Sequence, residues 1–379
     1  MAPRLDRTIA PPGEPPSRVR VGRGLATGAA PSGGLVVVDE RVLALHGLPA
    51  ALGDLPRLEV VGGEATKSFA ELERLLEGCA AAGLDRGSRL VAVGGGVTTD
   101  LAGLAAALYM RGIAWTAVPT TLLAQVDASV GGKTAIDLAA GKNLCGAFHA
   151  PGEVLVDPAY LATLPRGELL SGLGEVLKAA VLGARAPGAG TPLLDLLEGA
   201  PTEALLGPDP DLMTELVVAC VDHKADVVAG DPREAEAEPG GAPASPLPTS
   251  RKTLNLGHTF GHALELVGGY GRVPHGVAVA AGLHLALAAA ARLDRLQQPH
   301  LVDRLDALCA RLGLPGAATP VADVEAACDV VLDRARLVDA MALDKKGRAG
   351  TPRFVLPRAV GTASVGVELE PALLAELLA

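Results

Sequence analysis

Short apolar runs that alternate with amphipathic segments dominate the first half of the chain, and they restrict its fold more than any other feature. The runs are residues 34–39, 57–61, 89–93, 113–118 and 154–157. Apolar runs of this length, linked by helices, are typical of a parallel sheet whose two faces are both covered. The pattern therefore predicts a Rossmann-like α/β domain over residues 19–165.

The regular alternation ends near Leu161, and helical patterns follow it. We therefore expect a mostly helical second domain over residues 166–379, with the active site in the cleft between the two domains. Residues 235–250 are low in complexity and predict a surface loop without catalytic groups. Residues 1–18 are rich in Pro and Arg and predict a disordered tail.

Composition narrows the class of ligand. The formal net charge of −10 and the aromatic content of 2% argue against nucleic acid and against an anionic membrane surface. The apolar segment 277–291 is interrupted by Gly282 and His284 and is too short for a membrane span. Five cysteines without CxxC spacing indicate reduced thiols. We expect a cytoplasmic protein that acts on a small molecule.

A glycine-rich turn from Gly94 to Asp100 follows one predicted strand and opens a helix. This arrangement presents backbone N–H groups to a phosphate, although a plain tight turn would have the same pattern. Arginine outnumbers lysine 25 to 8, and most lysines lie in Gly-, His- or Asn-rich motifs, which marks them as candidate site residues. Lys178 follows Glu175 by three positions, a spacing that by itself indicates an exposed ion pair of small energetic weight.

Three histidines lie within eighteen positions of one another. His258 and His262 are four residues apart, so a helix would place both on one face, with Glu265 near them and His275 ten residues further on. Imidazole and carboxylate groups together are zinc-type ligands. Two surface or core histidines on an amphipathic helix would show the same spacing.

Several motifs occur in one order between about residues 34 and 360 and resemble those of 3-dehydroquinate synthases. They are Gly94–Asp100, Pro119–Lys133, Gly141–Asn143, Gly174–Lys178, Lys224, Arg251–His262, His275–Gly276 and Asp344–Lys346. This family belongs to the sugar phosphate cyclases, which share a fold with metal-dependent polyol dehydrogenases. The resemblance implies an enzyme of the shikimate pathway that uses NAD and Zn²⁺ or Co²⁺. It would convert 3-deoxy-D-arabino-heptulosonate 7-phosphate to 3-dehydroquinate and phosphate.

The same resemblance implies roles for individual residues. The implied metal ligands are Glu175, His258 and His275, so that His262 lies on the substrate side. The implied NAD contacts are Asp39, Glu64, Lys67, Gly95, Gly96, Val97, Asp100, Thr120, Thr121, Lys142, Tyr160, Leu161, Ala162 and Thr163. The implied phosphate ligands are Lys133, Asn143, Asn255, His262, one of Lys345 or Lys346, and Arg111 from the second subunit of a homodimer. Arg251 and Lys224 would bind the substrate carboxylate, while Asp127 and Lys178 would order hydroxyls and relay protons.

The chain departs from the family pattern at Thr99, Leu104 and Asp137, where Gly, Phe and Asn are usual, and in the 235–250 insertion. Alternatives are an amino-dehydroquinate or valiolone-type synthase, a polyol dehydrogenase, and an inactive paralogue that only binds ligand. Lys224 and Arg251 together favour a substrate with a carboxylate. The lysines favour a sugar phosphate over an unphosphorylated polyol.

Overall fold

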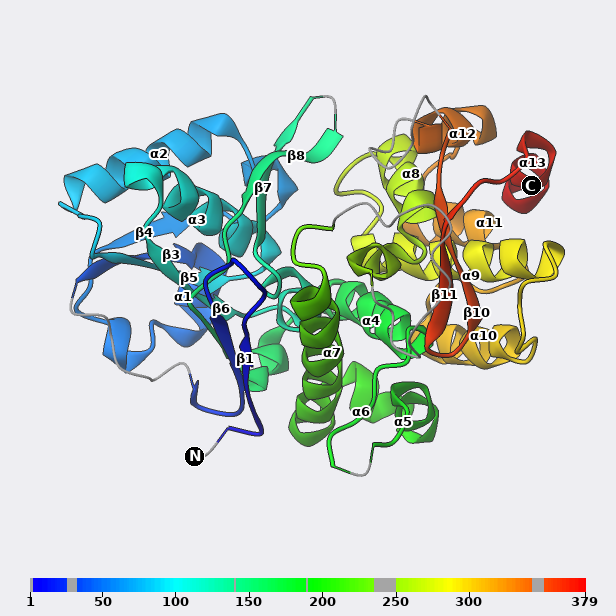
Figure 1. Ribbon diagram of the computed structural model, residues 1–379, viewed down its shortest axis with the longest axis horizontal. Helices are drawn as coiled ribbons and strands as arrows, with labels where there is room; N and C mark the ends of the chain where they lie inside the picture. The colour runs from blue at the N-terminus through cyan, green and yellow to red at the C-terminus, as the bar shows by residue number, and fades with distance from the viewer. Residues whose placement is uncertain (1–2, 26–32, 140, 189, 235–249, 343–350) are drawn as a thin grey trace. The chain divides into compact units, whose positions relative to one another are not determined.

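The computed structural model describes residues 3–25, 33–139, 141–188, 190–234, 250–342 and 351–379 (Figure 1). It divides into two compact units. The first contains residues 1–165 and 208–229, and the second contains residues 166–207 and 230–379. The predicted insertion loop, residues 235–250, lies outside the described residues except for Ser250. Lys345 and Lys346 also lie outside the described residues.

In the described chain, a seven-stranded sheet organises the first unit, in the order β1-β2-β9-β6-β5-β3-β4. The strands are β1 (Leu5–Ile9), β2 (Ser17–Val21), β3 (Gly34–Asp39), β4 (Arg57–Val60), β5 (Arg89–Gly94), β6 (Ala114–Pro119) and β9 (Glu153–Val156). All neighbours are parallel except β1 and β2. The predicted parallel sheet is confirmed, because the five apolar runs form its central strands and one edge.

The predicted disordered tail, residues 1–18, is wrong for residues 5–9 and 17–18, which lie in β1 and β2. These strands form an antiparallel pair, with Leu5 opposite Val21, and β2 continues the sheet beside β9. Val19 and Val21 are fully buried while their neighbour Arg18 points outward, which is the alternation of a half-buried strand. The high Pro and Arg content concealed this short alternation.

Four α-helices of the described chain belong to the first unit. They are α1 (Glu40–His46), α2 (Phe69–Ala81), α3 (Gly96–Leu108) and α7 (Pro210–Gly230). The core contains Val36, Val38, Val91 and Val93 from β3 and β5. Burial of these valine side chains contributes roughly 1.5–3 kcal/mol each to folding.

The assignment of residues 208–229 to the second domain is wrong. Their helix α7 belongs to the first unit, where Arg7 of β1 forms ion pairs with Asp222 and Asp226, and Arg23 pairs with Asp211 at 2.9 Å. The helical periodicity of α7 predicts a helix correctly. Periodicity cannot indicate which of two cores a helix joins, because the partner surface is distant in the sequence.

The segment after β6, which is rich in glycine and charged residues, has regular secondary structure. It contains a π-helix, η5 (Ala124–Ala128), and an antiparallel hairpin of β7 (Lys133–Leu138) and β8 (Gly141–Phe148). The glycines and charged residues of this segment are unusual in strands and hid the hairpin. As a result, Lys133 and Asn143 are presented by paired strands.

Helices form most of the second unit. They are α4 (Arg166–Val181), α5 (Leu193–Gly199), α6 (Thr202–Leu206), α8 (His258–Gly268), α9 (His275–Arg292), α10 (Leu301–Leu312), α11 (Pro320–Cys328), α12 (Arg334–Ala342) and α13 (Pro371–Leu378). A two-stranded sheet of β10 (Phe354–Ala359) and β11 (Thr362–Val367) completes it. Asp329 ends α11 in the left-handed conformation, with a φ of 50°, and separates it from α12.

Helix α9 lies at the centre of the second unit and packs against both α4 and α8. Among the described helices it alone is long and apolar enough to cross a bilayer, and most of it is buried inside the protein. Its hydropathy is therefore that of a core helix. Helices α4 and α8, together with α9 itself, supply the metal-type ligands.

Candidate active site

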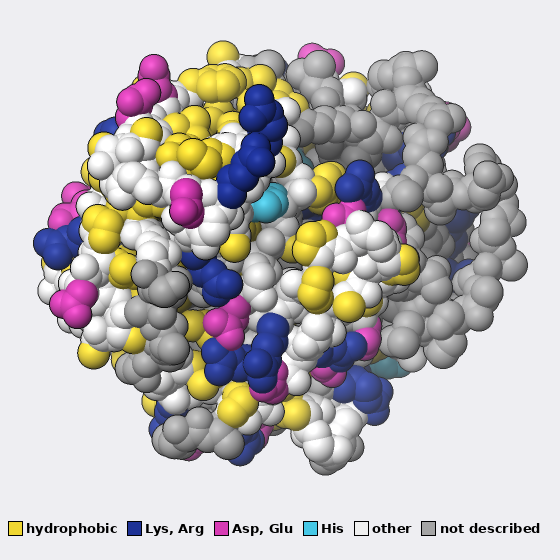
Figure 2. All heavy atoms as spheres, turned by 60° about the vertical axis from the view of Figure 1, so that its left-hand side comes forward, with side chains coloured by type: hydrophobic (Ala, Val, Ile, Leu, Met, Phe, Trp, Pro, Cys, Tyr) yellow, Lys and Arg dark blue, Asp and Glu magenta, His cyan; other side chains and the backbone are white. Residues whose placement is uncertain are grey.

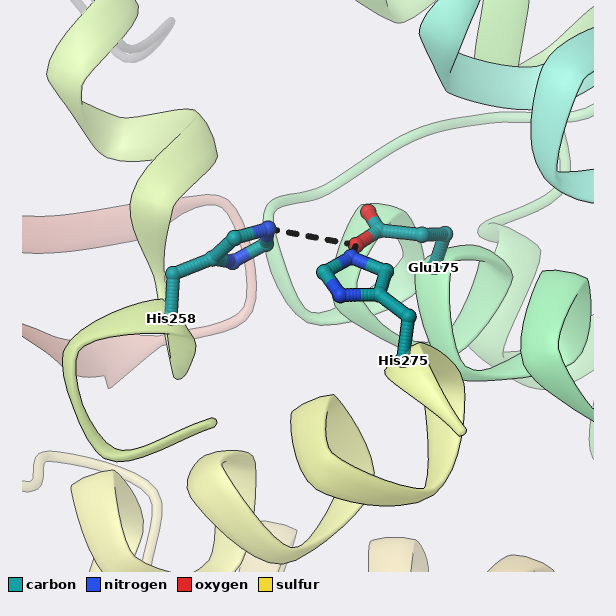
Figure 3. Close-up of side chains that lie close together, drawn as sticks. All are labelled: Glu175, His258 and His275. Atoms are coloured by element: carbon teal, nitrogen blue, oxygen red, sulfur yellow. Dashed lines mark hydrogen bonds and ion pairs between the residues drawn. The ribbon is translucent and has the colours of Figure 1, made fainter. Parts of the chain in front are cut away.

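One carboxylate and two imidazoles meet in the second unit (Figure 3). Glu175 comes from α4, His258 is the first residue of α8, and His275 is the first residue of α9. The Nε2 atoms of His258 and His275 lie 3.3 and 3.1 Å from Glu175 Oε1. One potential ligand atom from each residue lies within 4.8 Å of the other two.

The second nitrogen of each imidazole also has a partner. His258 Nδ1 lies 3.2 Å from the carbonyl oxygen of Leu256, and His275 Nδ1 lies 3.3 Å from Oε2 of the buried Glu265. A carbonyl or carboxylate oxygen only accepts, so these partners favour a proton on each Nδ1, which leaves each Nε2 as the nitrogen that a metal ion would bind in place of a proton. This donor set fits a zinc-type ion, with further coordination positions left for substrate or water.

Electrostatics keep the ligand carboxylate ionised. Burial raises the pKa of Glu175, but Lys178 and the two histidines outweigh it and hold that pKa well below the usual value. Glu175 and Lys178 form an ion pair and are only 2% and 3% exposed. The prediction of an exposed ion pair from their spacing is therefore wrong, because residues 171–181 of α4 are all buried.

The two imidazoles differ in charge preference. Burial and the nearby Lys178 lower the pKa of His258, which favours the neutral form that a metal requires. Burial also disfavours protonated His275, but the carboxylates of Glu265 and Glu175 raise its pKa to about 10. A metal ion that binds here displaces a proton from His275, so the affinity for the metal depends on pH.

Glycines set the spacing of the three helices. A Cβ atom on Gly174 would lie 2.4 Å from the carbonyl oxygen of Gly276, and one on Gly276 would lie 2.1 Å from that of Ser171. Similarly, a Cβ on Gly282 of α9 would lie 2.1 Å from the Gly257 carbonyl oxygen, immediately before α8. Backbone thus meets backbone beside each ligand, so that short side chains reach a common point.

His262 occupies a different place from the ligands. It is one turn after His258, its side chain is exposed, and its ring centroid is 5.2 and 6.2 Å from those of His258 and His275. It is not among the three residues that converge. The spacing of His258 and His262 correctly places both on one face of α8, but only His258 belongs to the triad.

Two further candidate site residues, Arg251 and Asn255, lie just before α8. Arg251 is buried, and its guanidinium donates to the Pro232 carbonyl oxygen at 2.5 Å. Asn255 Nδ2 donates to Glu234 Oε1 at 2.5 Å. Both side chains are therefore held by residues 232–234, immediately before the inserted segment.

In the first unit, the candidate NAD residues gather at the carboxyl ends of the parallel strands. Asp39 is the last residue of β3 and caps α1, Gly95 follows β5, and Thr120 follows β6. These three strands are neighbours in the sheet, and the segment Tyr160–Thr163 follows β9 at the next position. Ligands of open α/β sheets bind at this edge.

The glycine turn opens α3 without a side-chain cap. Gly95 is the N-cap residue, and a Cβ there would lie 3.0 Å from Thr121 Cγ2. The N-terminal N–H groups of α3 are therefore not satisfied by an N-cap side chain, and the helix dipole favours an anion. This geometry supports the phosphate-binding interpretation of Gly95, Gly96 and Val97.

A buried lysine forms the centre of a second group in the first unit. Lys67 Nζ lies 2.8 Å from Asp100, 3.5 Å from Glu64 and 3.9 Å from Asp137, and it contacts the Asn143 side chain. Burial lowers the pKa of Lys67, but the three carboxylates outweigh it and leave that pKa raised. Burial raises the pKa of Asp100 to about 6, although Lys67 opposes this shift. Lys142 joins the group through Glu64, at 3.8 Å.

Lys224 of α7 and Asp127 of η5 form a pair within the first unit. Lys224 Nζ lies 2.7 Å from both Asp127 Oδ1 and the Asp127 carbonyl oxygen. Arg111 stands apart, in a turn in which Met110, Arg111 and Gly112 all have positive φ. A pairing across nearly a hundred residues, such as 127 with 224, leaves no local signal in the sequence.

Comparison with known proteins decides the family. A family model described as 3-dehydroquinate synthase N-terminal matches residues 57–171, and the corresponding C-terminal model matches residues 172–347. A 3-dehydroquinate synthase of Opitutus terrae is 43% identical over 344 residues, covering 90% of this chain and 86% of that protein. One of Paracoccus denitrificans is 41% identical over 377 residues, covering 95% of each. The chain belongs to the 3-dehydroquinate synthase family.

Solved structures of other enzymes share the fold of this chain. The chain resembles 2-epi-5-epi-valiolone synthase ValA of Streptomyces hygroscopicus subsp. jinggangensis, bound to NAD⁺ and Zn²⁺, with a TM-score of 0.75 and 27% identity over 95% of both chains. It shares its fold with a 2-deoxy-scyllo-inosose synthase complexed with carbaglucose-6-phosphate, NAD⁺ and Co²⁺, with a TM-score of 0.79 and 21% identity over 99% of both chains. The predicted combination of a Rossmann-like and a helical part is confirmed.

Local sequence patterns do not predict the roles of three supporting residues in this member of the 3-dehydroquinate synthase family. Glu265 lies near the histidines in sequence, but only the structure shows that it is the partner of His275 Nδ1. Gly174 and Gly276 belong to the family motifs, and only the structure shows that their contact sets the distance between α4 and α9. A glycine directly beside a ligand-type residue in an apolar helix was the available signal.

Proposed function

We propose that the chain is a lyase, 3-dehydroquinate synthase, which converts 3-deoxy-D-arabino-heptulosonate 7-phosphate to 3-dehydroquinate and phosphate. The observation that carries the proposal is the triad of Glu175, His258 and His275, with both Nε2 atoms directed at one carboxylate oxygen. Relatives above 40% identity that share at least 83% of their length with this chain are 3-dehydroquinate synthases. We also propose that the enzyme is a cytoplasmic homodimer.

The cofactors are NAD and a divalent ion, either Zn²⁺ or Co²⁺. Glu175, His258 and His275 would hold the ion, and Lys178 would maintain Glu175 in its ionised form. When bound, the ion acidifies and polarises the oxygen substituents of the substrate, and NAD accepts and later returns a hydride. The remaining work of binding, orientation and proton transfer falls to side chains of this chain.

Residues of the first unit would bind the cofactor. The N-terminus of α3 would bind the pyrophosphate, and Thr120 and Thr121 follow the neighbouring strand β6. Asp39 and the segment Tyr160–Thr163 contact the remainder of the cofactor. Lys67, Glu64, Asp100 and Lys142 form the charged wall beside it.

The substrate would be held by its two anionic ends. Lys133, Asn143, Asn255, His262 and either Lys345 or Lys346 bind the phosphate, with Arg111 of a second subunit. Arg251 and Lys224 bind the carboxylate. Asp127, which is paired with Lys224 Nζ at 2.7 Å, and Lys178 would order the substrate hydroxyls and relay protons.

Phosphate release distinguishes this function from the related ones. The heptulosonate phosphate should yield one phosphate per turnover with a catalytic amount of NAD, and NADH should not accumulate. Stoichiometric NADH without phosphate would instead establish a polyol dehydrogenase. Turnover of sedoheptulose 7-phosphate, which lacks the carboxylate, in preference to the heptulosonate would establish a valiolone-type synthase. Turnover of an amino-heptulosonate phosphate in preference to the heptulosonate phosphate would establish an amino-dehydroquinate synthase.

The His258→Ala variant is the control for these assays. It measures any turnover that does not depend on the triad.

A further inference from the structure

The β7–β8 hairpin of the first unit has an irregular register. Ile136 is opposite Cys145 and Leu138 is opposite Gly141, so Asp137 alone faces Lys142, Asn143 and Leu144. Such a bulge interrupts the ladder of backbone hydrogen bonds and redirects the side chains of the bulged strand. Two of the bulged residues, Lys142 and Asn143, are candidate ligands of the cofactor and the substrate.

The bulge places Asn143 in a backbone conformation that needs support. Its φ is 53°, in the left-handed region that non-glycine residues rarely adopt. Its backbone N–H donates to Asp137 Oδ1 at 2.8 Å. The carboxylate of Asp137 therefore holds the backbone of the bulge at Asn143.

Asp137 also links the hairpin to the lysine group. Its backbone N–H donates to the Lys67 carbonyl oxygen at 2.9 Å, and Lys67 Nζ in turn contacts the side chain of Asn143. The three residues thus form a closed circuit of contacts. Moving the backbone of Asn143 would move its amide away from Lys67 and would shift the adjacent Lys142.

The electrostatic surroundings argue against a purely stabilising role. Asp137 is partly buried near Glu64, and burial and Glu64 both raise its pKa, although the N–H of Asn143 and the ammonium of Lys67 lower it. A carboxylate near two other carboxylates around one lysine is a poor choice for stability alone. Its hydrogen bond to the backbone of Asn143 instead indicates that it positions the bulge.

We propose that Asp137 is a positioning residue, whose carboxylate oxygen holds the bulge so that Asn143 and Lys142 face the bound anions. The proposal rests on the proposed function for the substrate, in which Asn143 contacts the phosphate. For the cofactor it rests only on the arrangement of Lys142, Glu64 and Lys67. Asp137 acts through these neighbours and need not touch either ligand.

The test compares Asp137→Ala with Asp137→Asn, which keeps an acceptor oxygen. Asp137→Ala should raise KM for the heptulosonate phosphate and Kd for NAD by about tenfold, because it removes the carboxylate oxygen that accepts the Asn143 N–H. Asp137→Asn should stay within about twofold of the wild type. Asp85→Ala is the matched control, since Asp85 accepts a backbone N–H from Gly87 in an exposed turn. It should change neither constant.

The readouts separate positioning from folding and from the reaction itself. A folded Asp137→Ala with wild-type KM and Kd overturns the proposal, as does an Asp137→Asn as impaired as Asp137→Ala. If Asp137→Ala does not fold, Asp137→Ser is judged by the same criteria. Failure of the wild type to release phosphate contradicts the proposed function only, because calorimetric NAD binding still reports on Asp137.

Discussion

Gly174 and Gly276 are in backbone contact where α4 crosses α9, one residue from Glu175 and one residue from His275. A Cβ atom on Gly174 would lie 2.4 Å from the Gly276 carbonyl oxygen and 2.6 Å from its Cα. Real Cβ atoms do not approach backbone so closely, and backbone cannot rotate out of the way. The contact therefore determines how near the two ligands can come.

We expect Gly174→Ala to disrupt the metal site. Alanine favours a helix by about 1 kcal/mol over glycine, but the clash costs about 1–3 kcal/mol and forces α4 and α9 apart. Bound metal, measured after dialysis, should fall at least about tenfold. Gly167→Ala is the matched control in the same helix, because a Cβ there meets no atom within 4 Å. A Gly174→Ala protein with normal metal content would contradict this account.

Glu265 should set the affinity for the metal without being a ligand. Its carboxylate accepts the hydrogen bond of His275 Nδ1 and fixes the ring. Removing such a partner usually lowers affinity by about 10–100-fold. We expect Glu265→Ala to show this loss in competition with a chelator, and Glu265→Gln to retain part of the affinity. The exposed Glu368→Gln should behave as the wild type, and equal affinities in all four proteins would refute the role of Glu265.

His258 and His262 should respond differently to truncation. His258→Ala removes a member of the triad, so the purified protein should contain little metal and lack activity. His262→Ala removes an exposed side chain outside the triad and should retain metal while phosphate release slows. Metal analysis and phosphate assays on the same preparations decide the matter. Loss of metal from both variants would place His262 among the ligands.

His284 should make the protein sensitive to acid. It is 2% exposed in α9, and neither ring nitrogen has a hydrogen-bond partner among the described residues. Burial lowers its pKa from 6.5 to about 4, although Asp306, Asp323 and the Pro315 carbonyl oppose this shift. The unfolded chain therefore binds the proton more readily, so the free energy of unfolding falls as pH drops from about 6.5 to 4, by roughly 3 kcal/mol from this residue.

Replacing His284 by leucine isolates its contribution to the pH dependence of stability. Denaturant unfolding of His284→Leu should show a smaller loss of stability over this pH range than the wild type. Val279→Ala, a cavity substitution at a fully buried position of the same helix, should lower stability equally at each pH. Identical pH slopes for His284→Leu and wild type would rule out the histidine as the source.

Sequence patterns sufficed for features that depend on neighbouring residues. The strands Gly34–Asp39 and Arg89–Gly94, the glycine turn before α3, and the helix that begins near His258 all follow from local periodicity and turn chemistry. The residue types of the metal and lysine groups were also visible in the chain. Hydrophobic period and ligand chemistry are properties of the residues themselves.

Tertiary structure decided what depends on residues far apart. It joined α7 to the first unit through Arg7, paired Lys224 with Asp127, and turned residues 5–9 and 17–21 into sheet strands. These outcomes depend on which distant surface offers a complementary partner, and no local pattern records that surface. The ligand set has the same origin, because His258 and His275 reach Glu175 only where glycines allow three helix backbones to touch.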